Sequence, residues 1–99
     1  MDGPRPAGTW TARGLAKSHR WLCCGQRYRV IQAFVDYDRT LHPVGETWTF
    51  LGHSFVPYDD GMSFFVSLDG RQEWLIRLKW DSTQQGDVLD ALDAYFALI

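Results

Sequence analysis

Cysteine is scarce in this sequence of 99 residues, and long apolar runs are missing from it. The two cysteines, Cys23 and Cys24, are adjacent, so a disulfide between them would be strained and would not join distant parts of a fold. No segment approaches the roughly 18 apolar residues of a membrane span, and none has the apolar run of a secretory signal. These features predict a cytoplasmic protein with reduced thiols and no membrane segment.

The sequence also has few of the patterns that mark catalytic or metal sites. There is no second cysteine pair and no His-x-His cluster at zinc-ligand spacing, and no phosphate-binding glycine loop or nucleophile elbow. Loop aspartates would bind a hard cation only if they met, and aspartate is a common turn residue in its own right. We therefore predict no metal site, no cofactor and no catalytic residue.

One catalytic alternative stays open at His42. This histidine lies in the same predicted loop as Asp36 and Asp38, and a nearby carboxylate is what orients a general base. No nucleophile accompanies it, so a small hydrolase that uses His42 is the less favoured function.

What the chain does contain is enough apolar material for one domain. Hydrophobic residues make up 45% of the sequence, aromatic residues 15%, and charged residues 22%. A composition of this kind folds, and a mass of 11.4 kDa excludes a second domain.

Charge divides the sequence into two unequal parts. Residues 1–29 carry six basic residues against one acidic residue, whereas residues 30–99 carry four against eleven. Residues 1–24 are also interrupted by glycine and proline and have no sustained hydrophobic period. They are predicted to be a disordered basic arm, and residues 25–99 a single domain.

Hydrophobic alternation predicts four strands in that domain. They are expected at residues 28–37 with a bulge near Gln32 and Ala33, and at residues 46–55, 62–68 and 73–80. Residues 57–61 and the Asp69-Gly70 pair have the composition of hairpin turns. The first two strands are joined by a longer loop, residues 36–45.

A helix is expected after the last strand. Its apolar positions recur at helical spacing, and Ser82 with Gln85 matches a capping box. The apolar stripe consists of Val88, Leu89, Leu92, Tyr95, Phe96 and Ile99. Short hairpins followed by one helix predict a mainly β fold, with an SH3-like antiparallel barrel or a curled sheet covered by the helix.

A resemblance to a known family rests on two linked motifs, residues 42–52 (HPVGETWTFLG) and residues 57–61 (PYDDG). Together they resemble a family of small bacterial proteins known as domain of unknown function 3601 (DUF3601). Residues 35–38, 76–80 and 85–86 also resemble the family, so the similarity covers roughly residues 28–96. No activity, cofactor or catalytic residue is established for the family, and the resemblance therefore implies none here.

The leading functional hypothesis is a non-catalytic interaction module. Aromatic and acidic residues of the first loop (residues 36–45) and of the hairpin with its turn at residues 57–61 are expected to form one face. This face is similar to the aromatic groove that SH3-like domains offer to extended peptides. The predicted face consists of Asp36, Tyr37, Asp38, Tyr58, Asp59, Asp60 and Phe65. Its partner is an unidentified protein or peptide, and the acidic body favours a basic one. Core packing is the alternative role for these aromatic residues.

Nucleic-acid binding is the second hypothesis. The arm has basic residues for phosphate contacts and two tryptophans, Trp10 and Trp21, for stacking on bases. In that case Arg77 and Lys79 would extend the basic surface onto the domain.

Overall fold

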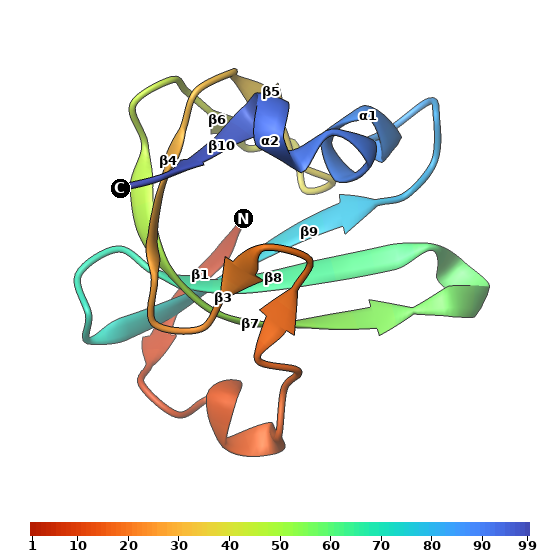
Figure 1. The fold of residues 1–99 in the computed structure, drawn as a ribbon. Coiled ribbons are helices and arrows are strands. Elements are labelled where there is room, and N and C mark those ends of the chain that lie inside the picture. The colour runs from red at the N-terminus through yellow and green to blue at the C-terminus, as the bar shows by residue number, and fades with distance from the viewer.

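The computed structural model describes residues 1–99 (Figure 1). The strands are β1 (Asp2–Pro6), β2 (Ser18–His19), β3 (Leu22–Cys23), β4 (Arg27–Val30), β5 (Phe34–Val35), β6 (Leu41–His42), β7 (Thr47–Val56), β8 (Gly61–Ser67), β9 (Gln72–Lys79) and β10 (Phe96–Leu98). The helices are α1 (Gly86–Asp90), α2 (Leu92–Tyr95) and the short 3₁₀ helices η1 (Thr11–Arg13) and η2 (Pro57–Asp59). None of the helices has the length and apolar character needed to cross a membrane.

Six strands form one antiparallel sheet in the order β1-β9-β8-β7-β4-β10. Two small hairpins, β2-β3 and β5-β6, complete the β structure. Strands β1 and β10 are the two edges of the large sheet and do not pair with each other. The predicted mainly β class is therefore confirmed, but the sheet is open and does not close into an SH3-like barrel, the first of the two expected forms.

The central strands β7, β8 and β9 follow the predicted alternation. On β8 and β9, Phe64, Ile76 and Leu78 point into the core, and Phe64 is paired directly with Ile76. The register of β7 against β8 shifts between Phe50 and Gly52. A side chain at Gly52 would meet the Ala16 carbonyl oxygen at 2.8 Å, so glycine permits the close approach of residues 15 and 16.

The first predicted strand is divided between two sheets. β4 ends at Val30, and β5 resumes at Phe34 as part of the small hairpin with β6. The expected bulge is thus a full change of sheet. It occurs because pairing of Phe34 with His42 buries both rings.

The predicted C-terminal helix is also divided. Ala91, with φ −136° and ψ 55°, separates α1 from α2, and the chain becomes extended at Phe96. Extended backbone lets β10 pair with β4 and places the Phe96 ring 5.4 Å from that of Trp48. Edge pairing and aromatic packing here override the helical period. Gln85 stands at the N-cap position of α1 but makes no side-chain capping bond; its side chain accepts a hydrogen bond from the Lys79 amide and donates one to the Val35 carbonyl oxygen.

The prediction of a disordered arm at residues 1–24 is wrong, because this segment is part of the fold. β1 pairs with β9 along the sheet edge, and Leu22 of β3 is fully buried in the core. The backbone amides of Gly8, Trp10 and Thr11 donate hydrogen bonds to the Glu73 carboxylate. The glycines and prolines that suggested disorder belong to a segment held by pairing at a sheet edge.

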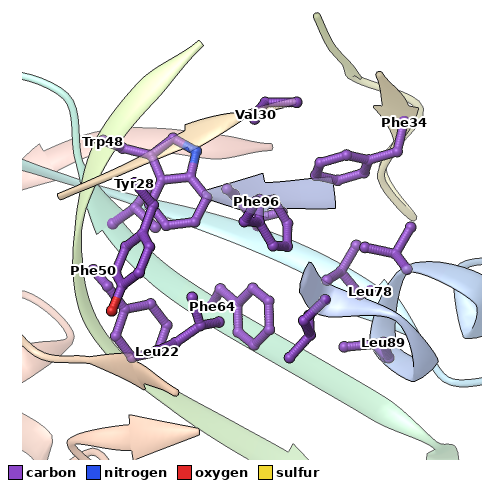
Figure 2. Close-up of a cluster of buried hydrophobic side chains, with 14 of the residues drawn as sticks. Leu22, Tyr28, Val30, Phe34, Trp48, Phe50, Phe64, Leu78, Leu89 and Phe96 are labelled. Carbon is purple, nitrogen blue, oxygen red and sulfur yellow. The ribbon is translucent and has the colours of Figure 1, made fainter. Parts of the chain in front are cut away.

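The core lies between the curved sheet and the covering layer of α1 and α2 (Figures 1 and 2). It is dominated by aromatic rings that meet edge to face, such as Phe50 with Phe64 and Tyr28 with Phe50. Figure 2 shows Trp48, Tyr28 and Phe96 next to one another, and Leu89 of α1 at the opposite end of the cluster. Many of the aromatic residues therefore pack in the core, where edge-to-face contacts between rings are favourable.

Candidate functional site

A groove of about 220 Å³ lies where the outer end of the β7-β8 hairpin meets the second half of β9. The loop after β5 reaches this place because the Tyr37 amide donates a hydrogen bond of 2.8 Å to the Arg77 carbonyl oxygen. The groove is lined by Tyr37, Val56, Asp59, Gly61, Met62, Ser63, Arg77, Leu78 and Lys79. At this groove the first loop and the hairpin turn at residues 57–61 come together.

The groove lies on the outer face of the sheet and has a charged rim. Met62 and Leu78 lie beneath it with their side chains on the core side of β8 and β9, so the apolar side chains that remain in its lining are those of Tyr37 and Val56. The Lys79 ammonium lies 6.0 Å from the centre of the Tyr37 ring, a cation–π arrangement that orients the ring. The exposed Asp59 carboxylate contributes the opposite charge to the same groove.

Three other residues of the predicted face lie close to this groove in the fold but do not line it. Tyr58 is 94% exposed beside Asp59 and makes no groove wall. Asp60 occupies the left-handed position of the turn, and its carbonyl oxygen accepts a hydrogen bond from the Trp80 amide. Asp38 bonds to Arg77 at 3.2 Å. The first loop and the hairpin are thus adjacent, as expected, but fewer of their residues than predicted lie on one surface.

Phe65 was assigned to the face incorrectly. Its side chain is only 6% exposed, and its ring lies 5.5 Å from that of Trp10. The residue does point to the outer side of the sheet, as the alternation predicted, but the N-terminal segment covers it there.

Asp36 was also assigned to the face incorrectly, because it is completely buried in an ionic cluster. Its Oδ2 atom lies 2.8 Å from Nε2 of His42 and 2.7 Å from the Met1 nitrogen. The other ring nitrogen of His42 lies 2.6 Å from Glu46. The predicted approach of His42 to Asp36 is therefore correct, and it occurs inside the protein.

Electrostatics explain how this cluster is tolerated. Burial by itself would lower the pKa of His42, but its hydrogen bonds to Glu46 and Asp36 outweigh burial and raise that pKa. Burial would likewise raise the pKa of Asp36, and the bonds from the Met1 nitrogen, His42 and Thr40 lower it instead. A protonated imidazole between two carboxylates satisfies both ring N–H donors.

The same geometry bears on catalysis and on metal binding. The His42 ring is fully buried, and each of its nitrogens is engaged by a carboxylate of the chain, so neither nitrogen faces a substrate. No group of three or more histidine, cysteine or acidic side chains converges on one point in the way a metal ion requires. The arrangement anchors the first loop.

A second buried carboxylate, Glu73 on β9, was missed by the sequence analysis. It is 3% exposed and accepts hydrogen bonds from the amides of Gly8, Trp10 and Thr11 and from the Thr11 hydroxyl. These bonds lower the pKa of Glu73 although burial opposes them. Its position on the outward side of a strand gave no signal that a distant loop would cover it.

Arg77, Lys79 and Ser63 were likewise not assigned to the binding face. The strand pattern would have indicated them, because Arg77 and Lys79 alternate outward on β9, two residues apart, and Ser63 is the cross-strand partner of Arg77. Cross-strand neighbours share a surface.

Comparison with known proteins identifies the family. The sequence pattern of the family described as "Domain of unknown function (DUF3601)" matches residues 15–99. The chain belongs to this family. A solved structure of an integron cassette protein from the mobile metagenome of Vibrio cholerae is similar to this DUF3601 chain, with 34% sequence identity and a TM-score of 0.82. The similarity covers 86% of this chain and 93% of the cassette protein. A comparison with the curated proteins gives no match.

Proposed function

We propose that this DUF3601 protein is a non-catalytic interaction module that binds an extended peptide segment of a partner protein in the groove between Tyr37 and Asp59. The observation that carries the proposal is the meeting of these two residues, from separate elements, in one groove on the outer face of the sheet. A small concave site that combines apolar side chains with a few polar groups is the usual form of a recognition site. It would act as the counterpart of the aromatic groove of SH3-like domains.

The chemistry of the groove indicates the partner. Asp36 is buried and Asp38 is paired with Arg77, so the exposed acids beside the groove that have no basic partner are Asp59 and Asp60. A partner segment with one apolar side chain against Tyr37 and Val56 and one basic side chain toward Asp59 fits this arrangement. The exposed ring of Tyr37 would pack against the segment, as aromatic residues do at interface centres.

Peptide display on the full chain tests this function. Peptides selected on the wild-type chain are measured for affinity against Tyr37→Ala and Asp59→Asn. Leu98→Ala and Asp93→Asn serve as matched controls, because both residues are exposed and distant in sequence from the groove. We expect at least tenfold weaker binding to the two groove variants, which is about 1.4 kcal/mol, and unchanged binding to the controls. Equal binding to all four variants would reject the groove as the site.

Nucleic-acid binding is a second candidate because the basic side chains of the N-terminal segment remain exposed. Arg5, Arg13, Lys17 and Arg20 all face solvent. The two tryptophans are less available for stacking on bases, since Trp10 packs on Phe65 and Trp21 packs on Tyr28. Binding of single-stranded DNA that falls steeply with salt, and that is lost when these four residues are changed to glutamine, would favour this function.

A further inference from the structure

Residues 1–14, here called the N-terminal strap, form a separable part of the structure. The family pattern begins at Leu15, so the strap lies outside it. Nevertheless the strap occupies one edge of the large sheet, where β1 pairs with residues 72–75 of β9. The surface that the strap covers belongs to strands inside the family pattern.

The receiving surface on β8 and β9 has three distinct parts. Along the edge of β9, Leu75 is paired with Asp2 of the strap, and Glu73 is paired with Arg5. The Glu73 carboxylate accepts all four of its side-chain hydrogen bonds from strap residues, at distances from 2.6 to 3.3 Å. The Phe65 ring receives Trp10 of the strap.

The strap itself is attached in a way that allows exchange. Its strand contains Pro4 and Pro6, which have no N–H to donate to β9, and its register shifts between Asp2 and Arg5. Residues 4–7 are exposed. A strand with few ladder bonds at a sheet edge belongs to the least stable part of a structure.

We propose that the edge of β9, with Glu73 and Phe65, is a strand-docking site, and that the strap is its resident ligand, exchangeable for a segment of another protein with the same chemistry. That segment is an extended strand followed by a turn, with its turn amides on Glu73 and an aromatic side chain on Phe65. Strand addition to a sheet edge is an established mode of peptide recognition. This site is separate from the groove at Tyr37, and neither proposal depends on the other.

Gly3 determines which strands fit. Its φ of 140° favours glycine, and a side chain there would meet the Glu73 carbonyl oxygen and the Trp74 ring, each at 2.9 Å. The ligand therefore needs glycine at this point of the strand. A substitution at Gly3 weakens the strap and leaves every residue of the receiving surface unchanged.

The experiment uses full chains and a labelled peptide of residues 1–14, with binding followed by fluorescence anisotropy. The Gly3→Val chain should bind the wild-type peptide at least tenfold more tightly than the wild-type chain does, because its own strap no longer competes. Adding Glu73→Gln to that chain should weaken binding at least tenfold. The Gly3→Val peptide, which is the matched control, should not bind.

A second variant guards against misfolding of the first. Trp10→Ala in the full chain weakens the strap by removing its contact with Phe65 and does not alter β1, and it should also gain peptide binding. Amide NMR spectra that retain the β7 and β8 signals establish that each variant is folded. The proposal is overturned if neither folded variant binds the wild-type peptide better than the Gly3→Val peptide, or if binding is insensitive to Glu73→Gln.

Discussion

The Nε2 atom of His42 lies 2.8 Å from Oδ2 of Asp36, and both side chains are completely buried. The imidazole also stacks on Phe34, with ring centres 4.7 Å apart and an interplanar angle of 14°. Because Asp36 contacts the Met1 nitrogen as well, this pair joins the first loop to the strap. The groove residue Tyr37 follows Asp36 directly, so the buried cluster positions one wall of the proposed binding site.

Replacing His42 should destabilise the protein strongly. His42→Phe keeps a flat ring against Phe34 but leaves Asp36 and Glu46 facing an apolar group. Removing one partner of a buried ionic cluster costs about 3 kcal/mol or more, and urea unfolding measures the loss. The matched control is Leu41→Ala, an exposed neighbour, which should stay within about 0.5 kcal/mol of wild type. Similar losses of unfolding free energy in the two variants would contradict a structural role for the cluster.

The cluster should make stability depend on pH in two directions. The raised pKa of His42 means that its contribution is complete below the ordinary value of 6.5 and is lost as the pH rises through the higher folded value. The lowered pKa of Asp36 means that its contribution is complete above the ordinary value of 3.8 and is lost in more acidic solution. The stability difference between wild type and His42→Phe should therefore be largest between about pH 4 and pH 6.5. A difference that grows above pH 7 would contradict the assignment.

His19 and His53 should show the opposite dependence. Their rings are 4.9 Å apart, and burial lowers the pKa of both, aided at His19 by the charges of His53 and Arg20. Their neutral forms are favoured in the folded protein, so stability is complete above pH 6.5 and decreases as the pH falls below it. NMR titration should give values below 6.5 for both rings, and His53→Phe should reduce the loss of stability in acid. A pKa at the ordinary value of 6.5 for either ring would show that the pair is open to solvent.

Gly52 should be far less tolerant of substitution than Gly61. A methyl group at Gly52 would meet the Ala16 carbonyl oxygen at 2.8 Å and Leu15 Cβ at 3.0 Å, whereas at Gly61 the nearest atom is an Asp59 oxygen at 3.5 Å. Gly52→Ala should lower stability by more than about 1 kcal/mol and weaken the bridge between Ala16 and His53. Gly61→Ala on the same hairpin should change stability by less than about 0.5 kcal/mol. Equal thermal midpoints for the two variants would contradict this account of the bend.

The strands of the central hairpins could be predicted from the sequence because their order is local. Residues such as Phe64 and Ile76 alternate with outward residues, and tight turns fix the register. The separation of β4 from β5 could not be predicted, since it depends on the pairing of Phe34 with His42. The helix prediction failed at Phe96 for the same reason, because pairing with β4 decides the conformation there.

The candidate site was only partly predictable. Tyr37 and Asp59 were expected on one surface, and they line one groove. Asp36 and Phe65 were expected beside them, and both are covered by strap residues that the composition had marked as disordered. Contacts of this kind join residues far apart in the chain, and hydrophobic periodicity, which is a local pattern, does not predict them.

The most direct test of the proposed function is an NMR map of the labelled full chain with its tightest selected peptide. We predict shift changes at the amides of Tyr37, Asp59, Met62 and Lys79, with those of β4 and β10 unchanged. Changes confined to other surfaces, or a saturating titration that leaves the amides of Tyr37 and Asp59 unmoved, would contradict the assignment of this groove as the binding site.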